Sequence, residues 1–442
     1  MSAAPDKRRG VLAGRVIPVV ATGVVVVGVM VATLWLVPET SRDPSRWAIG
    51  PDVWTNFQLA HLTIIGAYSA LYDGAGYLAP PALPLVLAPV WELSHLLGLA
   101  VGYEKLVPRP SAWYLLGPTT ALLCSLELFA ADSLAGQFGA SRGRRIALAG
   151  FSAIALWTIV AWGHPEDAIA VGFLLYAVGQ GVRERWVRCA WLLAAAFAFQ
   201  PLVALAIPVV LGAAPLRRLP SIVARILAPT ILMLVGPMIV NPTQTMIALV
   251  EQPAIPSLGR PTPWLHLTRP ILHEGLRAQF TGGPPRLIAV LIALGLGVLV
   301  HRRRPDGLTV TWLVACALAL RTAFDPVVLP YYTWPAIATA VIVAAAGSPL
   351  RLGATFVAGA LTTIVSDTDI YAEKLWWWIL LALATTMIAS SDLGRQRSAI
   401  SPAVAVAGSS GAGAANGGQL WGGTAGEGAA TNRWRAVRPA LR

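Results

Sequence analysis

Charged residues are scarce in this chain: only 12% of its 442 residues are Asp, Glu, Lys or Arg, whereas 56% are hydrophobic. A soluble domain carries about 25% charged residues, so this composition excludes an ordinary water-soluble globular protein. Apolar runs of about 18 or more residues, which is the length that crosses a hydrocarbon core, recur along the chain. The sequence therefore predicts an all-α polytopic membrane protein with about 10 to 12 transmembrane helices.

Cysteine and acidic residues are also few. The three cysteines, Cys124, Cys189 and Cys316, lie in or beside apolar runs and have no CxxC spacing, which argues against a disulfide framework or a zinc site. The 33 Lys and Arg residues outnumber the 21 Asp and Glu residues. They form short clusters between apolar runs, as expected for loops of a membrane protein, without the interleaved aromatic residues that single-strand binding requires. We therefore expect no nucleic-acid partner.

The basic clusters orient the chain across the bilayer. Residues 7–15 are rich in Lys and Arg and precede the apolar run 16–37, so we expect a retained signal anchor with a cytoplasmic N-terminus. The clusters at 142–145 and 183–188 face the cytoplasm only if the apolar stretch 82–103 does not cross. We therefore expect 82–103 to be re-entrant or interfacial, and 53–72 to form an interfacial helix in the first outer loop.

The remaining apolar runs complete a transmembrane domain over residues 1–389. Gln200-Pro201 interrupts residues 189–212, so we expect two half-helices that return the chain to the cytoplasm. A long outer loop covers 241–285, and the basic, Gly- and Ala-rich segment 390–442 predicts a flexible cytoplasmic tail that contacts anionic lipid. Full crossings are expected at residues 112–136, 146–162, 168–182, 221–239, 287–300, 308–320, 327–346, 352–365 and 375–389.

Asp52 is the first candidate for chemistry. It follows Gly50-Pro51 at the start of the interfacial helix, where the helix dipole keeps a carboxylate ionised. Such a carboxylate can act as a general base toward a sugar hydroxyl. The structural alternative is an acidic residue that caps the first turn. Asp43 is a second, weaker candidate for the same role.

The turn at 162–167 carries His164, Glu166 and Asp167 between two apolar runs. Three ionisable groups within four residues exceed what a turn needs, and ionisable residues at a membrane edge indicate function. A histidine with two acids is also a donor set for a divalent cation. The alternative is an ordinary wet outer loop.

The outer loop 241–285 carries His266, Arg269 and His273. Cationic donors near an outer membrane face suit a lipid-linked phosphate, to which Arg gives bidentate contact. The alternative is interfacial anchoring by Trp264 and Arg269.

Several short motifs follow Asp52 in order along the chain. In the first half they are 65–73 (IGAYSALYD), 77–85 (YLAPPALPL) and 87–89 (LAP); later come Gly163-His164, 196–202 (AFAFQPL), Phe324-Asp325-Pro326 and Tyr331-Tyr332.

This order resembles the GT-C class of membrane glycosyltransferases and, within it, the actinobacterial polyprenol-phosphate-mannose-dependent mannosyltransferases and related arabinofuranosyltransferases. The resemblance covers most of residues 16–346. The chain departs from the family at Gln200, where Lys is usual, and at His164, where Gln is frequent. The Glu166-Asp167 pair has no family role that we can assign.

The resemblance implies a GT-C-like bundle and an inverting glycosyltransferase of the plasma membrane with both termini in the cytoplasm. It would move a sugar, mannose by preference, from a polyprenyl-phosphate donor to a glycolipid or glycan acceptor at the outer face. Asp52 would be the base, and His266, Arg269 and His273 would hold the donor phosphate. No cofactor is implied beyond the divalent cation that the His164 turn could bind.

Two other classes of protein remain open. A lipid or solute transporter would also use a broken helix such as the one at Gln200-Pro201, together with outer-facing ionisable residues. A noncatalytic membrane scaffold would tolerate substitution of every outer acid. A transporter can be distinguished from an enzyme by the side from which its site is reached. In a transporter, polar groups near the middle of the bilayer are accessible from both faces of the membrane.

Overall fold

The computed structural model describes the helical part of the chain, residues 15–36, 51–72, 79–101, 110–251, 253–254, 256, 259–273, 276–367 and 373–392. All of these belong to one compact unit, Met1–Arg395. Asp43 lies outside the described residues, as does the predicted tail from residue 393 onward. Residues 390–392, which were expected to begin that tail, still belong to the last helix.

Seven helical segments in the described part are long and apolar enough to cross a membrane. The protein is therefore a multi-pass, mostly helical membrane protein, while the full number of crossings stays a prediction. The segments are α2 (Val16–Leu36), α6 (Trp113–Cys124) with α7 (Leu126–Gln137), α12 (Leu219–Val240), α14 (Pro284–Arg303), α15 (Gly307–Phe324), α17 (Pro349–Asp367) and α18 (Glu373–Asp392).

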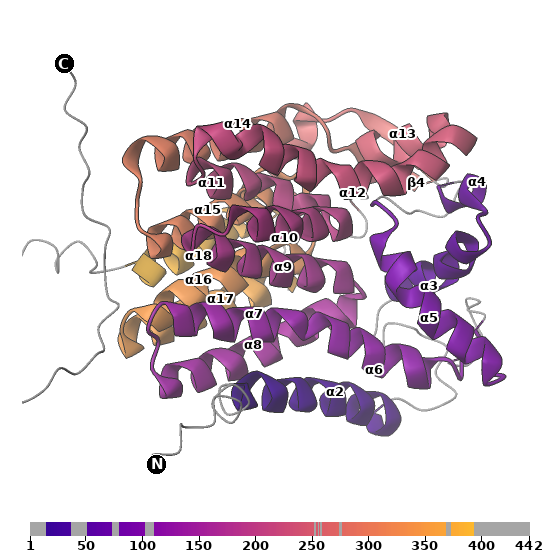
Figure 1. The fold of residues 1–442 in the computed structure, drawn as a ribbon, viewed down its shortest axis with the longest axis horizontal. Coiled ribbons are helices and arrows are strands. Elements are labelled where there is room, and N and C mark those ends of the chain that lie inside the picture. Colours follow the sequence, from indigo (N-terminus) through magenta and orange to yellow (C-terminus); the bar gives the residue numbers. More distant parts are fainter. Residues whose placement is uncertain are drawn as a thin grey trace, which may run out of the picture. The chain divides into compact units, whose positions relative to one another are not determined.

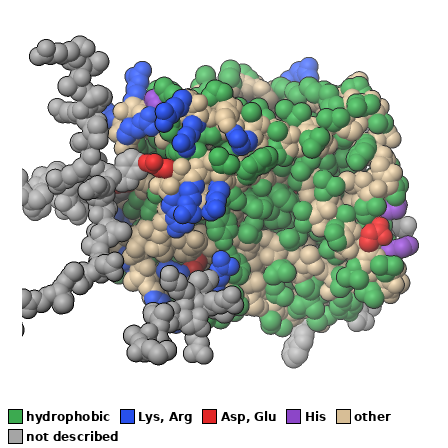
Figure 2. All heavy atoms as spheres, viewed as in Figure 1, with side chains coloured by type: hydrophobic (Ala, Val, Ile, Leu, Met, Phe, Trp, Pro, Cys, Tyr) green, Lys and Arg blue, Asp and Glu red, His purple; other side chains and the backbone are tan. Residues whose placement is uncertain are grey.

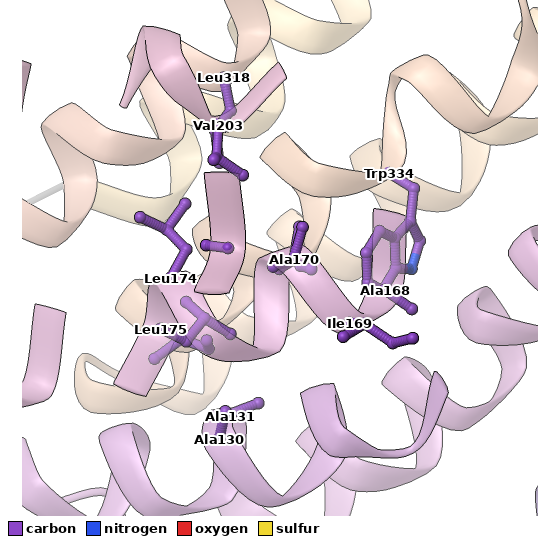
Figure 3. Packing of buried hydrophobic residues seen from close by; sticks show 14 of the residues in the cluster. Ala130, Ala131, Ala168, Ile169, Ala170, Leu174, Leu175, Val203, Leu318 and Trp334 are labelled. Atoms are coloured by element: carbon purple, nitrogen blue, oxygen red, sulfur yellow. The ribbon is translucent and has the colours of Figure 1, made fainter. Parts of the chain in front are cut away.

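Helix α9 (Pro165–Val182) lies at the centre of the bundle, where it packs on α7 and α10. Its Ala168, Ile169 and Leu174 are buried against alanines of α7 and against Trp334 of α16 (Trp334–Ala346) (Figure 3). The preceding helix α8 (Arg142–Trp162) packs on α2 and α7. Neither α8 nor α9 is among the seven segments.

The break expected at Gln200-Pro201 is confirmed. Helix α10 (Trp186–Phe199) ends there, and the chain continues as a 3₁₀ helix, η2 (Pro201–Leu205), and the short α11 (Ile207–Gly212). Proline has no N–H for a helical hydrogen bond and clashes with the preceding turn. Gln200 is accordingly extended, at φ −148° and ψ 110°, and its side chain is free to turn toward α9.

The stretch 53–72 forms two helices rather than one interfacial helix, and a third helix follows in the first outer loop. These are α3 (Pro51–Ile64), α4 (Tyr68–Leu71) and α5 (Ala82–Leu96), which lie together at one end of the bundle, on the right in Figure 1. Gly66 breaks the expected helix because its φ of +69° lies in the left-handed region. Helix α5 has 15 residues, which is shorter than a crossing needs, and it packs on α3.

The outer loop adds short strands to the otherwise helical fold, and the sequence did not predict them. The outer loop after α13 (Pro242–Glu251) contains a three-stranded antiparallel sheet in the order β1-β4-β3, and a separate two-stranded ladder joins β2 to β5. Prolines prevent a continuous helix in this loop, so its backbone groups pair between strands instead. The strands are β1 (Pro253–Ala254), β2 (Arg260–Pro261), β3 (Pro270–His273), β4 (Leu276–Phe280) and β5 (Val327–Val328).

Basic side chains gather toward one end of the molecular surface. In Figure 2 they lie mainly on the left of the visible face, while hydrophobic side chains cover most of the rest. The cluster 142–145, expected in a loop, instead begins α8, where Ser141 caps the helix and Arg145 Nε donates to Asp132 Oδ1 of α7 at 2.7 Å. This segregation agrees with the positive-inside pattern, and the side of the membrane that each end faces stays a prediction.

Candidate functional site

Asp52 lies in the first turn of α3, at the bundle end that also holds α5. Pro51 begins the helix, a position that proline favours. Val53, Trp54 and Phe57 of α3 are buried, with Phe57 against Trp91 of α5 at 5.0 Å between ring centroids. The side chain of Asp52, in the first turn, is 54% exposed.

His164 lies in the turn between α8 and α9 and contacts Asp52 directly. Gly163 ends α8 in the left-handed conformation, at φ 78°, and Pro165 begins α9. The His164 Nε2 atom is 2.9 Å from Asp52 Oδ2, and its Nδ1 atom is 2.8 Å from Glu166 Oε1. The ring also stacks on Tyr331, with 3.9 Å between centroids. The fold thus joins two predicted site segments, Asp52 and the turn 162–167.

Both ring nitrogens of His164 face carboxylate oxygens at hydrogen-bond distance. A neutral imidazole carries only one N–H, so only the doubly protonated ring donates to both partners. Burial by itself lowers the pKa of His164, but the charges of Glu166 and Asp52 and their hydrogen bonds hold that pKa well above its usual value. The geometry and the neighbouring charges therefore favour a protonated ring between the two carboxylates.

Asp167 faces the helix break rather than Asp52. Gln200 Nε2 donates to Asp167 Oδ1 at 2.6 Å, so the interruption of α10 places an amide against a buried carboxylate. Two carboxylate oxygens, Asp167 Oδ2 and Glu166 Oε2, are buried without a hydrogen-bond partner in the described structure. These two oxygens are acceptors that a hydroxyl, a water or a proton can satisfy.

Arg321 is a site residue that sequence reasoning missed. It lies in the last turn of α15, where its Nε donates to Asp325 Oδ2 at 3.1 Å, and its guanidinium lies 3.3 Å from the centroid of the Tyr332 ring. Its positive charge also acts on Asp167, which links this group to the α9 cluster. Two signals could have found it: an ionisable residue at the end of an apolar run and its i,i+4 spacing to Asp325.

The predicted phosphate ligands lie in the outer loop, in and beside the 3₁₀ helix η4 (Pro263–Leu267) and at the end of β3. His266 and Arg269 are exposed. Arg269 lies 5.7 Å from the centroid of the Phe280 ring, and His273 ends β3 with a side chain outside the described part. The loop is attached to α15 where Trp264 Nε1 donates to Ala323 O at 2.7 Å. No hydrogen bond or ion pair joins His266 or Arg269 to Asp52 or His164 within the described structure.

The described residues contain no group of three or more His, Cys, Asp or Glu side chains arranged to hold a metal ion. At His164, Asp52 and Glu166 lie within hydrogen-bond distance of the two ring nitrogens, so the donor set that the sequence suggested is paired within the protein.

No protein-family model, curated protein or solved structure matches the chain. The resemblance to GT-C enzymes therefore rests on the short motifs alone, and the arrangement of side chains has to carry any functional proposal.

Proposed function

We propose that the protein is an inverting glycosyltransferase that moves a sugar, mannose by preference, from a polyprenyl-phosphate donor to a glycolipid or glycan acceptor at the outer face of the plasma membrane. One observation carries the proposal. Asp52, the residue that the GT-C resemblance implies as base, is half-exposed at one end of an apolar bundle and is hydrogen-bonded to a buried histidine. An accessible carboxylate with a fixed partner, next to a lipid-facing surface, suits proton abstraction from a hydroxyl of a bound acceptor.

The chemistry assigns each atom a destination. Asp52 takes the proton of the acceptor hydroxyl while the hydroxyl oxygen attacks the anomeric carbon. The bond from that carbon to the phosphate oxygen breaks on the opposite face, so the configuration inverts and polyprenyl phosphate leaves. Asp52 Oδ2 is held by His164, which leaves Oδ1 for the substrate. Because the leaving group is already a phosphate, the reaction needs a stabilising cation rather than a strong acid.

The outer loop supplies such cations. His266 and Arg269 are exposed in η4 and the residues that follow it, and His273 lies a few residues further along the chain. A planar guanidinium makes two parallel hydrogen bonds to phosphate. The exposed apolar faces of the long helices would hold the polyprenyl chain.

Asp52→Asn tests the proposal. The change keeps the size of the side chain and its capping ability but removes the base, so transfer of labelled sugar from polyprenyl-phosphate mannose in membranes should fall about 10²- to 10⁴-fold. Asp367→Asn, at an exposed position at the end of α17, is the matched control and should retain wild-type transfer. Near-normal transfer by Asp52→Asn, with equal protein in the membrane, would exclude Asp52 as the base.

A transporter is the second candidate, and the Asp167–Gln200 contact favours it. Discontinuous helices with buried polar groups at the break are typical of transporter binding sites, and here a buried acid meets such a break at 2.6 Å. Proteoliposomes separate the two functions. A transporter moves its substrate across the bilayer without chemical change, and Gln200→Ala should abolish that movement, whereas the enzyme forms a new glycosidic bond.

A further inference from the structure

We infer that His164 is a positioning residue: a doubly protonated imidazolium that bridges Asp52 to Glu166 and fixes the direction of the Asp52 carboxylate. The inference rests on the proposed function insofar as Asp52 is the base, but the bridge itself can be observed without any assay of sugar transfer. It stands on two contacts from one ring, 2.9 Å to Asp52 Oδ2 and 2.8 Å to Glu166 Oε1, and on the stacking of that ring against Tyr331.

Within the described structure, charged and titratable groups approach the ring from three elements. Helix α3 contributes Asp52, the start of α9 contributes Glu166 and Asp167, and the 3₁₀ helix η5 (Pro330–Tyr332) contributes Tyr331. Arg321 of α15 acts on Asp167 from the far side. The nearest charged neighbours of His164 are acids, and a positive ring is the state that they stabilise.

The three side chains differ in exposure, so the two less exposed ones, His164 and Glu166, can restrain the exposed Asp52. Asp52 is 54% exposed, whereas His164 and Glu166 are 15% and 11% exposed. An exposed carboxylate by itself samples several rotamers, so its reacting oxygen is seldom aligned. The His164 ring is hydrogen-bonded to Glu166 through Nδ1 and stacked on Tyr331. Because the ring is fixed in this way, it restrains Asp52 to one of these rotamers.

The number of protons on the His164 ring distinguishes a positioning role from a catalytic one. With a proton on each nitrogen, His164 has no lone pair with which to accept the proton of the acceptor hydroxyl. That proton must go to Asp52 and leave through its exposed oxygen. His164 therefore acts through Asp52 and contacts no reacting atom.

Nitrogen-15 NMR of protein labelled at histidine tests the bridge directly, since the two ring nitrogens of an imidazolium give nearly equal shifts and those of a neutral ring do not. His164→Gln assigns the resonance, and His95→Gln, at an exposed position in α5, is the matched control. We expect wild-type His164 to be doubly protonated at neutral pH. Asp52→Asn should weaken its proton affinity about tenfold or more, because an opposite charge at this distance is removed. A neutral His164 ring at neutral pH, or a proton affinity unchanged in Asp52→Asn, overturns the inference.

Kinetics then test positioning. We expect His164→Gln to lower kcat for sugar transfer about 10- to 100-fold, the scale of a misplaced reacting group, with little change in KM for the donor. His95→Gln should match wild type. A wild-type kcat in His164→Gln overturns the positioning role. If wild-type protein transfers no sugar at all while the NMR result holds, the proposed function fails and the imidazolium bridge stands.

Discussion

His164, Glu166 and Asp167 show how a membrane protein holds charge at the edge of an apolar core. Taking an ionised group out of water is costly unless a charged or hydrogen-bonding partner replaces the water. His164 has two carboxylate partners and Asp167 has the Gln200 amide. The protonation of His164 should therefore be coupled to the stability of the fold.

We expect the protein to lose stability as the pH rises above about 6.5, the ordinary pKa of histidine. The native pKa of His164 is raised, so between the two pKa values the folded state binds a proton that the unfolded chain has released. The contribution of the bridge is complete below the unfolded pKa and is lost as the pH rises through the native pKa. Thermal unfolding in detergent, followed from acidic to alkaline pH, measures this loss. His164→Gln should flatten the dependence and His95→Gln should not; equal slopes in wild type and His164→Gln would contradict the expectation.

The sequence identified most of these residues singly but not their contacts. Asp52, His164, Glu166 and Asp167 could be found because ionisable residues at the edge of apolar runs are unusual. The pairing of Asp52 with His164 could not, because it depends on how α3 folds back onto the turn between α8 and α9. Arg321 was missed because its contacts with Asp325, Tyr332 and Asp167 depend on the tertiary fold.

At the scale of elements, the turn between α8 and α9 sets the position of the site. Gly163 has a φ of 78° and immediately precedes His164. Gly139, after α7, has the same φ of 78°, and a Cβ atom added there meets nothing within 4 Å. The two glycines therefore adopt the same left-handed backbone conformation at two different turns.

We expect Gly163→Ala and Gly139→Ala to destabilise the protein equally, by about 1–2 kcal/mol, the cost of a left-handed residue with a Cβ atom. Only Gly163→Ala should also reduce sugar transfer, because it moves the residue next to His164. Thermal unfolding and the membrane transfer assay, run on both variants, check the two parts. Equal losses of transfer would mean that stability alone is responsible.

Helix lengths and breaks were predictable where one signal dominated. The apolar run 16–37 became α2, and Gln200-Pro201 ended α10, because length and proline act locally. The single interfacial helix expected over 53–72 was wrong, since Gly66 and the residues after it divide it. The strands of the outer loop were missed because each is only two to five residues long, which is too short for an alternating pattern to appear.

For the molecule as a whole, the separation of basic from acidic and histidine side chains predicts its orientation. Arg302 is exposed in the last turn of α14, and Ser69 is exposed in α4, at the end that carries Asp52. Positive charge stays in the cytoplasm, so these two positions should face opposite sides of the membrane.

Single cysteines test this orientation. With Cys316 replaced by Ala, Cys124 and Cys189 are buried and should not react with a membrane-impermeant maleimide. We expect Ser69→Cys to be labelled in intact cells and Arg302→Cys only after the membrane is permeabilised. The reverse pattern would place the Asp52 site in the cytoplasm and remove the outer-face reaction.

The central position of α9 has a consequence for the synthesis of the protein. Its first turn carries Glu166 and Asp167, and nearly all of its side chains are buried by other helices rather than by lipid. Acidic residues make a segment a poor substrate for insertion from the translocon by itself. We therefore expect α9 to enter the bilayer together with its neighbours: α7, made earlier, offers a protein surface, and α10, made next, brings Gln200 to Asp167. Biogenesis and assembly of the site would then be a single event.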